Sequence, residues 1–209
     1  MRKRTALAVR RVAGRTIETI TGARSAWCFR PHYHAGDEIV RLTAGRARLR
    51  LANGWRAVEA GETVVIPAGS VHRFEPVDAE GWAFTSEFAL ASDGARDHLS
   101  PSVDQRLVAR AIELLAQRGT LRSDAEDLAQ RCGVSAGYLS RAFQRATGTG
   151  LHNFHVLIVI QKAKALLRAG APLADAAVDS GFCDQAHLTR EFVRTYGFTP
   201  NAFRSAWAP

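Results

Sequence analysis

Two ten-residue segments of nearly the same sequence limit the possible folds of this chain more than any other feature. LSRAFQRATG occupies residues 139–148 and LTREFVRTYG occupies residues 188–197, with Leu, Arg, Phe, Arg and Gly at matching places. A repeat of this kind indicates one supersecondary unit built twice. An account of the fold therefore starts with this repeated unit.

The match extends on both sides and has the spacing of a helix-turn-helix. A small residue is followed by a Gly that can supply a left-handed turn, and then by a Leu and a Phe four residues apart on one helix face. The matching positions are Ala129, Gly133, Leu139 and Phe143 in the first copy and Ala177, Gly181, Leu188 and Phe192 in the second. We predict helix-turn-helix units over about 123–147 and 172–196, joined by one helix over 151–169.

The outward positions of the second helix of each unit are the candidates for reading DNA. Arg and Gln suit bidentate contacts with guanine and adenine. A single exposed Arg is most often only a solvated charge, but Arg141 and Arg190 recur at the same place in both copies. The predicted DNA-binding residues are Gly137, Tyr138, Ser140, Arg141, Gln144, Arg145, Gln185, Ala186, His187, Thr189, Arg190 and Arg194.

These helices resemble the AraC/XylS family of bacterial transcription regulators. The similarity lies in LAQRCGVSAGYLSRAFQRATG and in PLADAAVDSGFCDQAHLTREFVRTYGFTPNAFR, the second being close to the C-terminal signature of the family. Gly137 and Val159 depart from the family pattern, in which bulkier or charged residues and a basic residue are usual. The resemblance implies a DNA-binding domain over 103–207, a sensor domain before it and no enzymatic activity.

The first part of the chain has the alternation of β-strands. RARLRL at 46–51 places Ala47, Leu49 and Leu51 on one face and arginines on the other, and Asn53-Gly54 follows as a hairpin signal. Further strands are predicted at 63–66 and 82–88. We expect an α+β multidomain chain with an all-β barrel over 1–90, a linker over 91–102 and an all-α domain over 103–207.

His32, His34 and Glu38 have the same parity, so on a single strand they would point to one side. With His72 they could bind a divalent transition metal. HYHAGDEIVRLTAG and GETVVIPAGSVHRFEP resemble the two cupin motifs, although Pro76 replaces an Asn and Ala26 a Gly. The resemblance implies a cupin-like barrel that senses a ligand.

Three interpretations of this barrel stay open at the level of sequence. It could hold a metal at these four residues, bind a small organic effector without metal, or be purely structural. Trp27, Phe74, Trp82 and Phe84 could line a pocket or simply fill the core. A rival class, a cupin metalloenzyme, does not account for the duplicated helical unit.

The charge balance favours a polyanionic partner. The 209 residues carry 28 Lys and Arg against 20 Asp and Glu, a net charge of +8. We expect double-stranded DNA as partner, with RNA polymerase and a small-molecule effector as further candidates, no membrane, and a monomer or a homodimer. The three cysteines lack metal-ligand spacing and predict buried thiols of a cytoplasmic protein.

Overall fold

A computed structural model describes residues 5–12, 15–51, 54–89, 103–119, 121 and 125–208. They form two compact units, one of strands and one of helices. The division falls inside the sixth helix. Residues 94–191 belong to the helical unit, and residues 192–209 belong with residues 1–93 to the strand unit.

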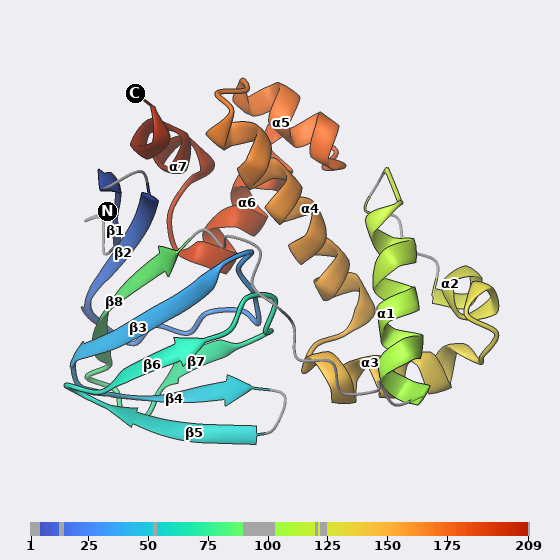
Figure 1. The fold of residues 1–209 in the computed structure, drawn as a ribbon, viewed down its shortest axis with the longest axis horizontal. Coiled ribbons are helices and arrows are strands. Elements are labelled where there is room, and N and C mark those ends of the chain that lie inside the picture. Colours follow the sequence, from blue (N-terminus) through green and yellow to red (C-terminus); the bar gives the residue numbers. More distant parts are fainter. Residues whose placement is uncertain are drawn as a thin grey trace. The chain divides into compact units, whose positions relative to one another are not determined.

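The strand unit consists of two antiparallel sheets (Figure 1). Its strands are β1 (Thr5–Val12), β2 (Arg15–Ser25), β3 (Asp37–Ala44), β4 (Arg46–Leu51), β5 (Gly54–Glu59), β6 (Thr63–Ile66), β7 (Arg73–Pro76) and β8 (Trp82–Ala89). One sheet has the order β1-β2-β8-β3-β6 and the other the order β5-β4-β7. The predicted strand-rich first part is therefore confirmed.

Alternation of side chains places the core between the sheets. Along β3, Glu38, Val40 and Leu42 are buried while Asp37, Ile39 and Arg41 are exposed. The predicted inward residues Ala47 and Leu49 of β4 are completely buried, whereas Leu51 is half-buried. A one-residue shift of either strand would exchange its buried and exposed faces, so the hydrophobic pattern fixes the register.

A glycine of the first cupin-like motif is explained by close packing. Gly45 connects β3 and β4 with a φ of 72°, and a Cβ there would lie 2.2 Å from the carbonyl oxygen of Gly81. Any other residue would combine a strained backbone with a backbone collision. The motif glycine thus allows the turn between β3 and β4 to approach the start of β8.

The helical part is built from seven helices within the described residues. They are α1 (Val103–Ala116), α2 (Ala125–Arg131), α3 (Ala136–Thr147), α4 (Leu151–Arg168), α5 (Leu173–Ser180), α6 (Gln185–Tyr196) and α7 (Pro200–Trp207). The α2–α3 and α5–α6 pairs are the two copies of the repeat, and α4 is the predicted connecting helix.

The repeated residues do what their spacing predicts. Gly133 and Gly181, with φ of 72° and 107°, end the first helix of each copy in the left-handed conformation. Leu139, Phe143, Leu188 and Phe192 are completely buried, and Ala129 and Ala177 at most 2% exposed. The repeated residues are therefore buried at equivalent positions in both copies.

Several expectations differ from the structure or lie outside it. The first strands, β1 and β2, begin at Thr5 and Arg15, well before residues 46–51, the first strand that the sequence analysis predicted. The cysteines are not buried, since Cys28 and Cys183 are exposed and Cys132 is intermediate. The predicted linker over 91–102 and the turn residue Asn53 lie outside the described residues. Among the described helices, none has both the length and the apolar character needed to cross a bilayer.

Candidate functional site

The four predicted ligand residues meet in the strand unit, but not in the way that parity suggested. His32 and His34 precede β3, and only Glu38 lies on that strand; His72 lies just before β7. The expectation of one continuous strand carrying His32, His34 and Glu38 is therefore wrong. The chain around His32 pairs instead with the chain around His72.

Two backbone hydrogen bonds join the two motifs. The His32 amide donates to the His72 carbonyl at 2.9 Å, and the His72 amide donates to the His32 carbonyl at 2.8 Å. This isolated antiparallel bridge brings the two imidazole centroids to 4.5 Å from each other. A contact between residues far apart in sequence is thus fixed by the backbone.

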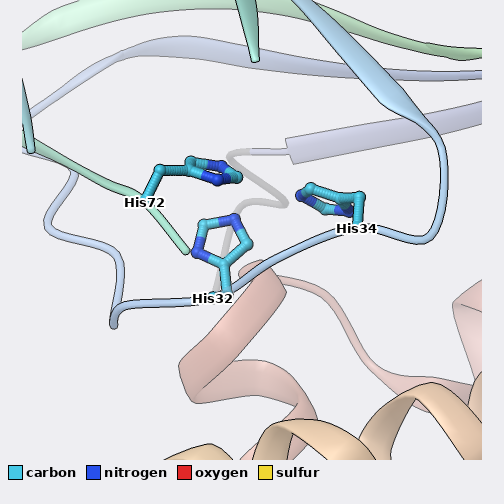
Figure 2. Close-up of side chains that lie close together, drawn as sticks. All are labelled: His32, His34 and His72. Atoms are coloured by element: carbon cyan, nitrogen blue, oxygen red, sulfur yellow. The ribbon is translucent and has the colours of Figure 1, made fainter. Parts of the chain in front are cut away.

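The three imidazoles point toward one another (Figure 2). One ring nitrogen from each of His32, His34 and His72 lies within 4.8 Å of the others, and all three residues are buried. The centroid of His34 lies 5.0 Å from that of His32 and 5.5 Å from that of His72. Converging buried imidazoles of this kind are typical of a transition-metal site.

Backbone carbonyls set the tautomers of two of these rings. Nδ1 of His32 lies 2.8 Å from the carbonyl oxygen of Arg30, and Nδ1 of His72 lies 3.0 Å from that of Ser70. A carbonyl oxygen only accepts, so each Nδ1 carries the hydrogen. In the neutral ring Nε2 then keeps its lone pair, which is the arrangement found in metal-binding histidines.

Glu38 completes the cluster. Its Oε2 lies 2.9 Å from Nε2 of His72 and 3.4 Å from Nε2 of His34, and it is 5% exposed. The 2.9 Å contact with His72 is a hydrogen bond when Nε2 carries a proton and a close approach of two lone pairs when it does not. The contact holds a cation, either a proton on His72 Nε2, which makes an ion pair with Glu38, or a metal ion bound by both atoms.

The spacing suits a metal ion as that cation. Two ligand atoms at about 2.0–2.2 Å from one ion lie about 3.0 to 3.4 Å apart at octahedral to tetrahedral angles. The contacts of Glu38 with His72 and His34, at 2.9 and 3.4 Å, have these lengths. The residues therefore fit a divalent transition metal.

The charge state of Glu38 agrees with this role. Burial opposes its ionisation, but the imidazoles of His72 and His32 and the hydroxyl of Ser86 outweigh burial and hold the pKa of Glu38 below its usual value. Glu38 is therefore a carboxylate, the form that binds metal ions. Ser86 is a site residue that the sequence analysis missed, although its inward position on β8 follows from the alternation of WAFTSEF.

The cluster borders a cavity of about 30 Å³. Phe74, Trp82 and Phe84, predicted as lining or core residues, line it, whereas Trp27 is not among its lining residues. Thr195 and Tyr196 at the end of α6 also line it. The sequence analysis did not place Thr195 and Tyr196 near the histidines, because the contact joins residues far apart in the chain and no local motif indicates it.

The predicted DNA-binding positions of α3 lie on its solvent face. Gly137, Tyr138, Ser140, Arg141, Gln144 and Arg145 are all exposed. Ser135 begins the helix, and its hydroxyl accepts from the Tyr138 amide at 3.3 Å. The six residues share one surface with room for a partner.

The corresponding positions of α6 are exposed in four of six cases. Gln185, Ala186, Arg190 and Arg194 are exposed, and His187 and Thr189 are half-buried. The hydroxyl of Thr189 donates to the carbonyl of Gln185 at 2.8 Å, and the His187 ring packs edge-on against Phe182 at 5.1 Å. Contact with DNA stays a prediction for all twelve positions.

A carboxylate of α1 holds two of the predicted DNA-binding residues. The Tyr138 hydroxyl donates to Asp104 Oδ1 at 2.8 Å, and the Arg145 guanidinium donates to Asp104 Oδ2 at 3.0 Å. Hydrogen bonds from Arg145 and Tyr138 lower the pKa of Asp104, so the carboxylate is ionised. The sequence analysis did not detect this contact, since α1 carries no part of the repeat.

Comparisons with known proteins agree with both parts of the chain. Residues 128–206 match the family model of a helix-turn-helix domain, and residues 19–81 match that of a cupin domain. These two matches cover the parts of the chain that resemble an AraC-type DNA-binding domain and a cupin, in the predicted order. The resemblance recognised from the repeat and the cupin motifs is therefore confirmed.

Solved structures resemble this chain over most of its length. ToxT from Vibrio cholerae is 9% identical, with a TM-score of 0.58, over 91% of this chain and 97% of ToxT. Wild-type ToxT with bound unsaturated fatty acid is 11% identical, with a TM-score of 0.55, over 93% and 96%. At these identities the likeness concerns the fold alone.

A shorter likeness covers half of the chain. A transcriptional regulator with an AraC-type DNA-binding domain from Chromobacterium violaceum is 22% identical, with a TM-score of 0.46, over 50% of this chain and 94% of that one. No curated protein matches the sequence.

Proposed function

We propose that this chain is a sequence-specific DNA-binding transcription regulator whose cupin domain senses a divalent transition metal. The proposed ligands are His32, His34, Glu38 and His72. The proposed DNA-reading elements are α3 and α6. The observation that carries the metal assignment is the convergence of three buried imidazoles, with one nitrogen of each within 4.8 Å of the others, beside the Glu38 carboxylate, whose Oε2 lies 2.9 Å from His72 Nε2.

The size of the cavity favours an ion over an organic effector. A water molecule needs about 10–15 Å³ of such space, and pockets for organic ligands have about 300–1,000 Å³. The cavity of about 30 Å³ beside the histidines suits one ion with a water molecule. The same argument favours a sensor over a metalloenzyme, which needs space for a substrate beside the metal.

The protein residues would hold the metal in a site that is shielded from water, with a negative charge that partly balances the charge of the metal. Nε2 of His32 and His72 faces inward because Nδ1 is engaged by a carbonyl, and Glu38 supplies one negative charge. The aromatic rings around the site, such as that of Phe88 at 4.3 Å from the His34 ring, limit the access of water. A bound metal would supply a positive charge and fixed coordination directions.

The repeat supports the reading of DNA at two places by one chain. The second helix of each copy carries exposed Arg, Gln or Thr positions suited to base edges. The connecting helix α4 has 18 residues and is therefore about 27 Å long at ~1.5 Å per residue. This length is comparable with one DNA turn, roughly 34 Å, so α3 and α6 would read adjacent major-groove segments.

Selection of bound duplexes from a random DNA library tests the DNA assignment. We expect two recognised motifs about one helical turn apart. Arg141→Ala should relax the base preference in one motif and Arg190→Ala in the other, each with a loss of about 5-fold to 150-fold in affinity. Arg24→Ala is the matched control, because Arg24 is an exposed arginine of the strand unit that pairs with Glu80.

The result of this selection decides the proposal. Unchanged base preference in both recognition-helix variants would overturn the assignment of these residues. Failure to recover any sequence would overturn the regulator function.

A further inference from the structure

The sixth helix joins the proposed DNA-reading residues to the proposed metal site. Gln185 lies at the first turn of α6 and Tyr196 at its last residue. Thr195 and Tyr196 belong to the strand unit and line the cavity beside His32 and His34. One helix therefore carries both exposed positions proposed to read DNA and two residues that line the cavity.

Tyr196 contacts two of the proposed ligands. Its ring centroid lies 5.9 Å from that of His32, at an interplanar angle of 89°, and 5.8 Å from that of His34, at 42°. Tyr196 is 4% exposed and Thr195 is 1% exposed. In such a closely packed interior, the histidine rings cannot turn toward an ion without changing their contact with Tyr196.

The chain after Tyr196 is fastened to the strands of the same unit. The Thr5 hydroxyl donates to the Gly197 carbonyl at 3.1 Å, and the Trp207 indole donates to Glu18 at 3.2 Å. Glu18 is completely buried, and α7 packs against β1. The end of α6 therefore has defined anchors on the domain that contains the histidines.

We propose that Tyr196 couples metal occupancy of the histidine site to DNA binding. In this proposal, the position of the last turn of α6 depends on the positions of the His32 and His34 rings. This inference rests on the proposed function and names the regulation of that site. A bound metal fixes the two rings, the rings fix Tyr196, and α6 keeps the arrangement in which its exposed positions read DNA. By linkage, DNA raises the affinity for metal by the same factor.

The coupling is measured as a ratio of affinities. DNA affinity is determined with Co²⁺ and with EDTA, using the duplex recovered by selection, and Co²⁺ affinity is determined with and without that duplex. For the unmodified chain we expect both ratios to agree and to lie at about 5-fold to 150-fold. Tyr196→Leu removes the ring contacts with the histidines and should bring both ratios close to one.

Phe198→Leu is the matched control for a merely structural role. Phe198 stacks on Tyr196 at 5.9 Å between centroids and is 7% exposed, but it is not among the residues that line the cavity. The same ring-to-Leu change should leave both ratios at the value of the unmodified chain. A substitution that changes DNA affinity equally with Co²⁺ and with EDTA leaves the ratio unchanged. A general change in DNA affinity therefore does not affect the comparison.

The outcomes separate this inference from the proposed function. Binding of both Co²⁺ and DNA with ratios near one in the unmodified chain would overturn the coupling and leave the proposed function standing. Equal loss of the ratio in Tyr196→Leu and Phe198→Leu would overturn the role of Tyr196. Absence of Co²⁺ binding would overturn the metal sensor and the coupling together, and absence of DNA binding would overturn the regulator.

Discussion

His32 and His72 exchange two backbone hydrogen bonds, at 2.9 and 2.8 Å, although they belong to different sequence motifs. The bridge holds the two imidazoles with their centroids 4.5 Å apart. A ligand that engages both rings needs little rearrangement of the backbone. Preorganisation of this kind strengthens binding, because the ordering of the ligands has already occurred on folding.

Loss of one ring from this bridge should sharply weaken metal binding. His72→Ala keeps the backbone hydrogen bonds and removes one nitrogen ligand together with the partner of Glu38 Oε2. Loss of a supporting residue around a metal typically lowers affinity 10–100-fold, so loss of a direct ligand should exceed about 100-fold. Calorimetric titration with Co²⁺ measures the change.

His152→Ala is the control for this titration. His152 is an exposed residue of α4 and should leave the Co²⁺ affinity unchanged. Equal Co²⁺ affinity of His72→Ala and the unmodified chain would show that the metal does not bind at the histidine cluster.

Metal should also stabilise the folded strand unit. A ligand that binds only the folded state at 100 times its dissociation constant adds about 2.7 kcal/mol to the free energy of unfolding. Thermal unfolding with Co²⁺ should therefore occur at a higher temperature than with EDTA. In Glu38→Gln, which removes the negative ligand, this difference should shrink, and an undiminished difference would contradict the role of Glu38.

The sequence was sufficient for the repeated helices because their signals are local. The Gly that ends the first helix and the buried Leu and Phe of the second, such as Leu139 and Phe143, recur within short distances in both copies. The four proposed metal ligands were also found, because the motifs HYHAGDE and PAGSVH name them. The assignment did not depend on a correct strand prediction.

The parts that were not predicted depend on contacts between distant residues. His32 and His34 lie outside β3 because the chain at His32 pairs with His72. The alternation of side chains along a single strand gives no information about this pairing. Tyr196 belongs to the second copy of the repeated segment, and the sequence analysis assigned it no role. That this ring lies against His32 follows from packing of residues 192–209 with the strands.

Removal of the Asp104 carboxylate should increase DNA affinity. Asp104 accepts hydrogen bonds from Tyr138 and Arg145, two proposed reading residues, and places a negative charge beside them. Asp104→Asn leaves the shape nearly unchanged and frees Arg145 for a phosphate or a base. We expect a several-fold tighter complex at low salt in an electrophoretic titration, with the gain decreasing as salt screens the charge.

Glu113→Gln separates this release from a general effect of charge. Glu113 lies on the same helix α1 and pairs with Arg110 at 3.3 Å, away from the contact of Asp104 with α3. Both variants raise the net charge by one. Equal gains in the two variants would show that charge alone acts and that the contact with Tyr138 and Arg145 has no role.

A buried histidine of α4 should make the stability of the helical unit depend on pH. His155 is completely buried, and neither ring nitrogen has a hydrogen-bond partner among the described residues. Burial lowers its pKa from the usual 6.5, with smaller contributions from the charges of Arg118 and His152. The folded state therefore binds this proton less readily than the unfolded state does.

The direction of the pH effect follows from this difference in pKa. Below about pH 6.5 the unfolded chain takes up a proton at His155 that the folded chain still refuses, so the free energy of unfolding falls as the pH falls toward the folded pKa. Above that value both states are neutral and the contribution is constant. His155→Leu should remove this loss, and should raise stability at neutral pH by about 1 kcal/mol, because no buried polar atom is left without a partner. Urea unfolding in EDTA at pH 7.5 and 5.5 measures it, and an equal decrease in stability in both chains would contradict the assignment to His155.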